Sequence, residues 1–319
     1  MNMDFVLAPD DNYARHAAAV VASILAHNPD HHIRIWILDG GLSEENRKKL
    51  SVYRNFSNYE VSFLNINPDN FKDFPESGYI TRATWYRLKI GELIPETVQK
   101  CLYLDCDTIV NSSLAELFAL DLTEKCAAVG IDCIFEKFLK NHRNYFPSDY
   151  QYFNAGVILF NLQEWRAQSI EKDIMDFVVE NPRRLKLLDQ TILNIFLRGK
   201  TVDFGIKYNF QFTPKVLCET SYSRRKLEYR SAAPSPAIIH FVGEFKPWKI
   251  GYNALNPYYR LYLTALSETE WRMSPEEAAA FAEESEREKG KIFYKMLFKQ
   301  IKRKPWWIFR KYFWNRIFL

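Results

Sequence analysis

The chain has 319 residues, of which 47% are hydrophobic and 16% aromatic, and its formal net charge is +4. This composition excludes a disordered chain, because enough apolar surface is available to build a substantial core. The five cysteines include no C-x-x-C pair, which favours free thiols in a reducing compartment over a disulfide framework or a zinc site.

The small net charge hides an asymmetry between the body of the chain and its end. Residues 287–319 hold 11 basic residues and one acid, whereas residues 1–286 hold 32 basic and 38 acidic residues. A strongly basic end on an acidic body predicts a tail with a partner of its own. We expect neither a signal peptide nor a transmembrane helix, because no apolar stretch reaches about 18 residues.

Short apolar segments alternate with helical patterns in the first part of the chain. The patterns predict strands at residues 3–8, 33–38 and 59–66, with helices at residues 13–26 and 43–53 between them. This alternation predicts an α/β fold with a mainly parallel sheet. In such sheets ligands bind at the carboxyl ends of the strands.

The later elements follow a similar order. Helices are predicted at residues 81–93, 114–118, 170–179, 187–197 and 274–288, and strands at residues 101–104, 126–131 and 237–241. Residues 133–151 have no clear period and predict a loop or short helices over the site. Residues 207–236 are rich in polar residues, tyrosine and proline and are predicted to wrap the surface.

The stretch LYLDCDTIV at residues 102–110 ends a buried strand with two carboxylates. On an extended backbone Asp105 and Asp107 face the same side, while Cys106 faces the other. Two like charges this close disfavour each other unless a cation lies between them, and Mg²⁺ or Mn²⁺ held in this way is often shared with substrate phosphates. The alternative is that the aspartates only end the strand and begin a turn.

Four other motifs accompany this pair along the chain. They are APDDNY at residues 8–13, YFNAGV at 152–157, LDQ at 188–190 and HFVGEFKPW at 240–248. With them the chain resembles retaining glycosyltransferases of family 8, especially the bacterial galactosyl- and glucosyltransferases that extend lipooligosaccharide or lipopolysaccharide cores. The resemblance implies a GT-A fold with a Rossmann-like sheet flanked by helices, a UDP-galactose or UDP-glucose donor, and Mn²⁺ or Mg²⁺.

The resemblance also implies roles for single residues around the metal. It assigns the metal to Asp105, Asp107 and His240. It places Gly243 and Lys246 at the diphosphate, where a glycine lets the backbone approach and a lysine stabilises the leaving group. Without the resemblance, His240 would be a core or strand-end residue and Lys246 an exposed lysine.

The remaining matched residues would surround the donor. The resemblance implies donor binding by Ala8, Asp10, Asn12, Arg87, Cys106, Asp132, Asn154, Ala155, Asp189 and Gln190. The first three would hold the uridine and ribose, and the last five the transferred sugar. Asp189, Gln190 and Lys246 are the catalytic candidates, with Gln190 near the anomeric carbon. Alternatively, the first three residues form an ordinary turn, Arg87 is a solvated helix charge, and Asn154 is a structural hydrogen-bonding group.

The implied reaction is transfer of a hexose to a hydroxyl of a saccharide acceptor. Breaking the sugar–phosphate bond builds negative charge on UDP and positive charge on the anomeric carbon, which preorganised positive groups stabilise. No well-placed carboxylate nucleophile is evident, so the resemblance implies same-face attack by the acceptor hydroxyl. The leaving phosphate oxygen would take the hydroxyl proton. The acceptor is expected to be a lipopolysaccharide or lipooligosaccharide core, or another surface glycan.

We divide the chain into a catalytic domain at residues 1–270 and a helical tail at residues 271–319. The tail's last 33 residues contain ten aromatic residues among the basic ones. The sequence predicts a helix with an apolar face opposite a basic face. The apolar face consists of Ile292, Phe293, Met296, Leu297 and Ile301, and the basic face of Lys295, Lys299, Lys302 and Arg303. Pro305 ends this helix, and Trp306, Trp307 and Trp314 follow it.

Such a tail suits an anionic membrane interface. It predicts a peripheral protein on the cytoplasmic face of the inner membrane that acts on a lipid-linked acceptor. The alternative is a packed C-terminal helix pair with a solvated basic face. We expect no nucleic-acid partner, because the acidic body would oppose it.

Two other functions fit part of the pattern. The sequence DCDTIV at residues 105–110 also fits the D-x-D-x-T/V signature of haloacid-dehalogenase-type phosphatases, but no downstream Asp-Asp or G-D-x-x-x-D follows. A non-catalytic, membrane-bound nucleotide-sugar-binding protein is the second alternative. The complete set of Asp105, Asp107, His240 and Lys246 favours the enzyme.

Overall fold

The computed structural model describes most of the chain. The described residues are 1–72, 74, 82–132, 146–147, 149–181, 189–212, 225–243 and 246–303. They belong to two compact units, the first formed by residues 1–242 and 261–272 and the second by residues 243–260 and 273–319. Each unit is described by itself, and the predicted domain boundary near residue 270 stays a prediction.

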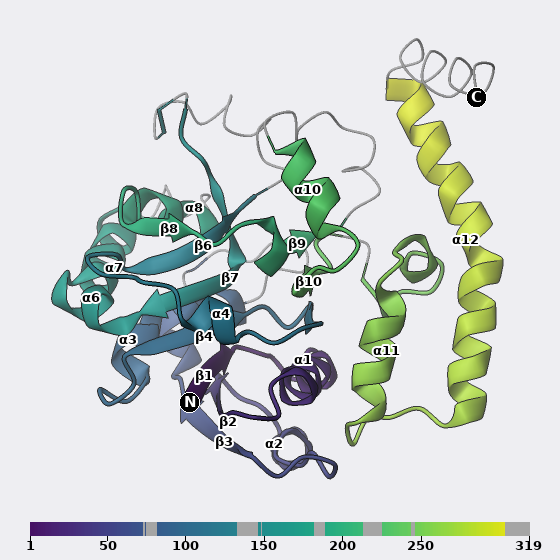
Figure 1. Cartoon of the computed structure of the whole chain (residues 1–319), viewed down its shortest axis with the longest axis horizontal. Helices are drawn as coiled ribbons and strands as arrows, with labels where there is room; N and C mark the ends of the chain where they lie inside the picture. Colours follow the sequence, from purple (N-terminus) through teal and green to yellow (C-terminus); the bar gives the residue numbers. More distant parts are fainter. Residues whose placement is uncertain are drawn as a thin grey trace. The chain divides into compact units, whose positions relative to one another are not determined.

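A seven-stranded sheet organises the first unit, in the order β3–β2–β1–β4–β7–β6–β8 (Figure 1). Its strands are β1 (Asn2–Leu7), β2 (His32–Asp39), β3 (Tyr59–Asn65), β4 (Lys100–Leu104), β6 (Ala127–Ile131), β7 (Phe153–Asn161) and β8 (Thr201–Asp203). All neighbours are parallel except that β7 runs antiparallel to β4 and β6. The predicted α/β fold with a mainly parallel sheet is confirmed. Because β7 is antiparallel, it begins beside the carboxyl end of β4.

Helices lie between these strands in the sequence, and further helices follow the last strand. The α-helices are α1 (Ala14–His27), α2 (Glu44–Leu50), α3 (Ile90–Leu93), α4 (Ala115–Phe118), α6 (Leu162–Ala167), α7 (Ile170–Glu180), α8 (Asp189–Phe196), α10 (Lys226–Ala232), α11 (Tyr259–Ser267) and α12 (Pro275–Arg303). The 3₁₀ helices are η1 (Pro68–Phe71), η2 (Arg82–Lys89), η4 (Ile206–Tyr208) and η6 (Asn253–Leu255). The helix predicted at residues 81–93 is therefore mostly a 3₁₀ helix. Four consecutive side chains, at residues 85–88, are buried, so packing against the rest of the fold overrides the local preference for an α-helix.

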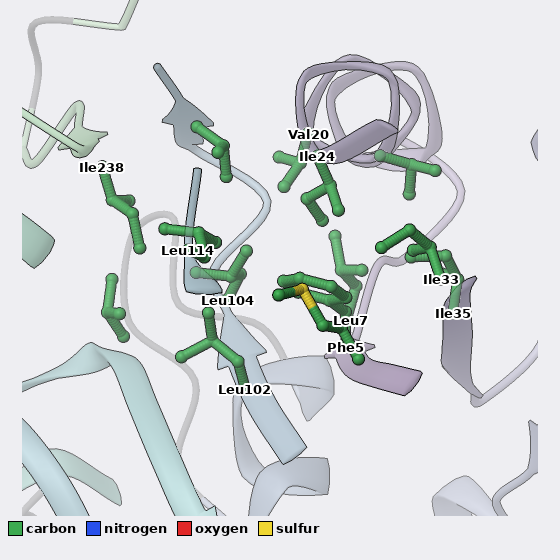
Figure 2. Close-up of a cluster of buried hydrophobic side chains, with 14 of the residues drawn as sticks. Phe5, Leu7, Val20, Ile24, Ile33, Ile35, Leu102, Leu104, Leu114 and Ile238 are labelled. Atoms are coloured by element: carbon green, nitrogen blue, oxygen red, sulfur yellow. The ribbon is translucent and has the colours of Figure 1, made fainter. Parts of the chain in front are cut away.

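Apolar side chains cover both faces of the central strands. Figure 2 shows Val20 and Ile24 of α1 facing Phe5 and Leu7 of β1, in one buried cluster. Val6 points to the other face, into a second buried cluster. Strands buried on both faces have near-continuous apolar sequences, which is why these segments were readable from the sequence. Burying each large side chain stabilises the fold by roughly 1.5–3 kcal/mol.

A small second sheet extends from the end of β4. It has the order β5–β10–β9, with β5 (Thr108–Val110), β9 (Phe210–Gln211) and β10 (Ile238–His240). Strand β10 pairs antiparallel with β5 and parallel with β9. The prediction that residues 207–236 wrap the surface is wrong for β9 and the residue before it, Asn209, because all three residues are buried. A two-residue strand has no detectable period, and its partner lies far away in the sequence.

The second unit contains the long helix α12. Ser274 caps it: Ser274 Oγ accepts from the Glu277 N–H at 3.2 Å, and Glu277 Oε2 accepts from the Ser274 N–H at 2.8 Å. This reciprocal pair is a capping box. The acidic helix predicted at residues 274–288 and the basic helix predicted after it are one continuous helix. No helix among the described residues is long and apolar enough to cross a bilayer.

One side of α12 packs within its own unit. Asn253 Nδ2 donates to Ser285 Oγ at 2.9 Å, and a Cβ added to Gly251 would lie 2.7 Å from Ile292 Cδ1. Ile292, which was predicted on the free apolar face, therefore contacts the Gly251 loop. The structure describes only the backbone of Met296, Leu297, Lys299, Ile301, Lys302 and Arg303. Four further predicted tail residues lie outside the described residues: Pro305, Trp306, Trp307 and Trp314.

Candidate active site

The two aspartates of the D-x-D pair lie in a turn between β4 and β5. Thr108 closes the turn, because its N–H and its Oγ1 both donate to the Asp105 carbonyl oxygen, at 3.2 and 2.9 Å. The predicted extended path is therefore wrong, and the alternative of a turn after the strand describes the backbone, with Cys106 buried in the hydrophobic core. The chain turns here because β5 leaves the large sheet to join the small one. The turn nevertheless brings the Asp105 and Asp107 carboxylates together.

Strand β10 adds a histidine to the two carboxylates. Its pairing with β5 sets His240 opposite Thr108, and the next N–H, of Phe241, donates to the Asp107 carbonyl at 2.9 Å. His240 Nε2 lies 3.2 Å from Asp107 Oδ1 and 3.8 Å from Asp105 Oδ2. The ligand atoms of the three residues all lie within 4.8 Å of one another. We call these three residues the carboxylate–histidine cluster.

Gly156 lets two members of this cluster pack against the backbone. A Cβ on Gly156 would lie 2.2 Å from His240 Cε1 and 2.7 Å from Asp105 Oδ2, so a larger residue would push both side chains away. Two carboxylates and an imidazole nitrogen that converge in this way form a donor set suited to Mn²⁺ or Mg²⁺. The residues present therefore fit the predicted metal. Gly156 was not among the predicted site residues, although a glycine inside a buried strand signals close approach of another group.

A bulge in β7 presents backbone groups to the site. The pairing with β6 shifts register, so that residues 155–157 have no partner on β6. Bulges next to active sites re-aim side chains and end regular pairing. Here the Ala155 N–H donates to Gln190 Oε1 at 3.1 Å, and the Ala155 carbonyl accepts from Arg87 Nη1. The Gly156 carbonyl accepts from the Asp105 N–H at 2.8 Å.

Arg87 is buried and holds two acidic side chains. Its Nη2 lies 2.8 Å from Asp105 Oδ1, and its Nε lies 3.2 Å from Asp189 Oδ2. The guanidinium also lies 4.4 Å from the centre of the Tyr103 ring, whose hydroxyl donates to Asp105 Oδ1 at 3.0 Å. The alternative of a solvated helix charge is wrong, because only 3% of Arg87 is exposed. Tyr103 was not predicted, since a tyrosine in an apolar strand gives no local signal of its hydroxyl partner.

Burial and these charges shift two pKa values. Burial would lower the pKa of Arg87, but the nearby Asp105, Tyr103 and Asp189 outweigh it and raise that pKa. Burial raises the pKa of Asp189 to about 6, against the opposing effect of Arg87. The pair thus combines a permanent cation with a carboxylate that ionises near neutral pH. Such perturbed groups are typical of functional sites.

The residues predicted around the sugar contact one another. Gln190 Nε2 donates to Asp132 Oδ2 at 2.9 Å, and Asn154 Nδ2 donates to Gln190 Oε1 at 3.2 Å. Asp132 and Asn154 are buried. A further buried residue, Asn209, lies between Asn154 and His240. Asn209 was not predicted, because it lies in the segment interpreted as a surface loop.

The APDDNY motif at residues 8–13 contacts the D-x-D turn through its first residue, Ala8. Ala8 is buried and hydrogen-bonds through its backbone to Cys106, whose pKa is raised by burial so that it stays a thiol. Asp10 Oδ1 accepts from the Tyr13 N–H at 2.9 Å, which is a local turn, and Asn12 is exposed. The structure therefore brings Ala8 to the site, while Asp10 also has the ordinary turn role that was the alternative.

Gly243 and Lys246 belong to the second unit, so their predicted place at the diphosphate stays a prediction. Gly243 has a φ of +70°, in the left-handed region that favours glycine. Lys246 is buried, with its Nζ 6.0 Å from the centre of the Trp248 ring. The alternative of an exposed lysine is wrong.

Comparisons with known proteins agree with this site. The model of glycosyl transferase family 8 matches residues 4–250. General stress protein A of Bacillus subtilis is 30% identical over 275 residues, which cover 84% of this chain and 94% of that protein. A lipopolysaccharide 1,2-glucosyltransferase of Escherichia coli K12 is 26% identical over 88% of this chain and 82% of its own length.

A solved structure has the same fold. The galactosyltransferase LgtC, in complex with donor and acceptor sugar analogues, superimposes with a TM-score of 0.73 and is 31% identical, covering 88% of this chain and all of that chain. This likeness confirms the predicted GT-A fold, and the comparisons do not favour the phosphatase or the non-catalytic binding protein. The family model spans more than half of the chain, including the carboxylate–histidine cluster. This chain therefore belongs to glycosyl transferase family 8.

Proposed function

We propose that the protein transfers a hexose from UDP-galactose or UDP-glucose to a hydroxyl of a saccharide acceptor, with retention and with Mn²⁺ or Mg²⁺. The observation that carries this proposal is the carboxylate–histidine cluster, two of whose members pack against Gly156, in a chain of this family. Relatives named as lipopolysaccharide 1,2-glucosyltransferase and 1,3-galactosyltransferase support a lipopolysaccharide or lipooligosaccharide core, or another surface glycan, as acceptor.

The chain's own residues hold the metal ligands in a fixed orientation. Asp105 Oδ1 is bound by Arg87 and Tyr103, so Asp105 Oδ2 is the oxygen that faces His240. Preorganised groups of this kind need no reorganisation during the reaction. A divalent cation, when bound, supplies positive charge that offsets the charge developing on the departing diphosphate.

The hydrogen bonds of Gln190 and Asp189 support same-face attack. The Gln190 oxygen accepts from the Ala155 N–H and from Asn154 Nδ2, and Asp189 is paired with Arg87. Neither side chain is placed as a free nucleophile. The bond between the anomeric carbon and the diphosphate oxygen breaks, and the acceptor oxygen bonds to that carbon from the same face. The acceptor proton passes to the leaving phosphate oxygen.

The test is hydrolysis and transfer by the purified chain, with UDP-galactose and UDP-glucose as donors and with Mn²⁺ or a chelator. We expect one UDP-hexose to turn over only with the metal. We expect Asp105→Asn to abolish turnover while the protein stays folded at the assay temperature, with a lower thermal unfolding temperature because the ion pair with Arg87 is lost. Wild-type protein that turns over neither UDP-hexose with Mn²⁺ would refute the proposal and favour the non-catalytic binding protein. Hydrolysis of phosphate monoesters instead would favour the phosphatase.

We also propose that the tail holds the protein at the cytoplasmic face of an anionic membrane, near a lipid-linked acceptor. Three aromatic side chains of α12 support this: Phe293, Tyr294 and Phe298 are 44%, 61% and 63% exposed. Exposed Lys291 and Lys295 lie among them. Aromatic and basic side chains together suit an anionic interface.

Vesicle sedimentation tests this second part. We expect the full chain to sediment with phosphatidylglycerol vesicles but not with phosphatidylcholine vesicles, and the double variant Phe293→Ser and Phe298→Ser to stay in solution. Equal sedimentation of the double variant and the wild type would contradict a role of the exposed aromatic side chains.

A further inference from the structure

A series of hydrogen bonds links the predicted metal ligand His240 to the predicted sugar residues. His240 Nδ1 lies 3.0 Å from Asn209 Oδ1, and Asn209 Nδ2 donates to Asn154 Oδ1 at 3.0 Å. Asn154 Nδ2 then donates to Gln190 Oε1, and Gln190 Nε2 donates to Asp132 Oδ2. We call these five residues the amide relay. All of them lie in the first unit.

Backbone groups of the β7 bulge fix the direction of the amide relay. The Gly156 N–H donates to Asn154 Oδ1 at 3.0 Å, and the Ala155 N–H donates to Gln190 Oε1 at 3.1 Å. A backbone N–H can only donate, so both side-chain oxygens must point toward the bulge. Asn209 must then offer its Nδ2 to Asn154, because two amide oxygens facing each other would repel. The Asn209 oxygen is left facing His240.

This direction places a proton on Nδ1 of His240, because a side-chain oxygen that faces Nδ1 accepts from an Nδ1–H. Nε2 faces Asp105 and Asp107, whose oxygens also accept. When a cation lies between Nε2 and these carboxylates, the Nδ1 proton leaves the Nε2 lone pair available to the cation. Asn209 and His240 are 1% and 3% exposed, so bulk water does not replace this partner.

We propose that Asn209 is a positioning residue that keeps the proton of His240 on Nδ1 and its Nε2 lone pair directed at the cation, and that the amide relay couples this arrangement to the residues around the donor sugar. The inference rests on the proposed function where it assigns the cation and the sugar. Partners of this kind orient histidine ligands in metal sites generally, and losing one typically costs about 10–100-fold in metal affinity. Asn209 itself contacts no member of the carboxylate pair.

A buried asparagine elsewhere in the same unit provides a matched control. Asn194 is fully buried and bonds to the backbone of Phe153 and to the Gln190 carbonyl. It has no bond to His240. Asn194→Leu therefore tests the loss of a buried amide as such, whereas Asn209→Leu tests the loss of the His240 partner.

The protonated nitrogen can be measured directly by NMR. The chain has six histidines, and ¹⁵N labelling of histidine, with His240 identified by its absence in His240→Gln, reports which ring nitrogen carries the proton. In metal-free protein we expect Nδ1 to carry a proton in the wild type and in Asn194→Leu. At the same pH we expect Nδ1 to be unprotonated, with the ring proton on Nε2 alone, in Asn209→Leu, or in Asn209→Ala if the leucine variant does not fold. An unprotonated Nδ1 in the wild type, or no change in the Asn209 variants, would overturn the proposal.

Mn²⁺ binding can be measured from the electron paramagnetic resonance signal of the free ion. This measurement distinguishes a positioning role of Asn209 from a general contribution to stability. We expect Asn209→Leu to weaken binding by roughly 10–100-fold. Asn209→Asp keeps an oxygen facing Nδ1 but loses the donor to Asn154, so it should lose less affinity than Asn209→Leu. Asn194→Leu should retain affinity within a few-fold. Equal losses in Asn209→Asp and Asn209→Leu, with both variants folded, would contradict the positioning role. A wild type that binds no Mn²⁺ would refute the metal in the proposed function, while the NMR result would still decide the role of Asn209.

Discussion

The two halves of the site differ in what holds their side chains in place. The charged half consists of Asp105 and Asp189, which the opposite charge of the buried Arg87 holds together, and of Asp107 beside Asp105. The amide half consists of Asn154, Gln190 and Asn209, which carry no charge and are oriented by hydrogen bonds. A charge attracts from many directions, whereas an amide must present its oxygen or its nitrogen. We therefore expect the charged half to supply the attraction for the proposed cation, and the amide half to orient the histidine toward it.

The bulge of β7 belongs to both halves. The Gly156 carbonyl accepts from the Asp105 N–H in the charged half, and the Gly156 N–H donates to Asn154 in the amide half. The halves are thus not independent, because one backbone segment fixes both. Substitutions at the bulge should affect both halves, and substitutions elsewhere should affect mainly one.

Gly156→Ala should have the largest effect, because its Cβ would occupy the space between His240 and Asp105. We expect Mn²⁺ affinity to fall by roughly 100-fold or more, the upper end of what disturbing the surroundings of a metal site costs. Overpacking should also lower the unfolding free energy by about 1–3 kcal/mol. Calorimetric titration with Mn²⁺ and denaturant unfolding would measure the two effects. A variant that binds Mn²⁺ as the wild type does would show that His240 and Asp105 need not pack against Gly156 to hold the cation.

Arg87→Lys should disturb the charged half alone. A lysine keeps the charge but has no planar fork, so it does not reach Asp105, Asp189 and the Ala155 carbonyl together. We expect the unfolding free energy to fall by about 1–3 kcal/mol for each buried partner left without its bond. Urea unfolding measures this loss. The His240 proton, followed by NMR, should stay on Nδ1, and a shift to Nε2 would contradict the separation of the two halves.

The raised pKa of Asp189 predicts a pH dependence of stability. Its folded-state pKa is about 6, against an ordinary value of 3.8, so between these values the folded state holds a proton that the unfolded state has released. The unfolding free energy contributed by this group therefore falls as pH rises from about 4 to about 6, by on the order of 3 kcal/mol, and is constant above. Asp189→Asn removes this contribution, so unfolding curves at several pH values should show a smaller fall in the variant. Parallel curves for the two proteins would contradict the raised pKa.

Tyr103→Phe should have the smallest effect. It removes the hydroxyl that donates to Asp105 Oδ1 but leaves the Arg87 contact with the same oxygen. We expect a loss of about 1 kcal/mol in unfolding free energy, the usual net value of one hydrogen bond, and a few-fold loss of Mn²⁺ affinity. Thermal unfolding and Mn²⁺ titration would measure both. A loss as large as that of Arg87→Lys would mean that the hydroxyl, and not the guanidinium, orients Asp105.

The sequence by itself determined the elements whose patterns are local. Strands β1, β2 and β3 and helix α1 were predicted to within one or two residues, because a sheet buried on both faces requires near-continuous apolar strands. The D-x-D pair marked the end of β4, and the order of the motifs indicated the family. In each case the signal lies within one short segment, or in a resemblance that spans the whole domain.

Only the tertiary structure decided which side chains meet. Asn209 borders a two-residue strand that pairs with β10, nearly 30 positions later, and no local period reveals such a strand. The residues next to Arg87 in the sequence are compatible with a solvated helix charge. Its two carboxylate partners lie 18 and 102 positions away in the sequence, and only the fold brings them beside it. Gly156, against which His240 and Asp105 pack, lies where the pairing of β6 and β7 shifts register. Local propensity is set by a residue's neighbours in sequence, whereas hydrogen-bond direction and metal-ligand geometry are set by neighbours in space.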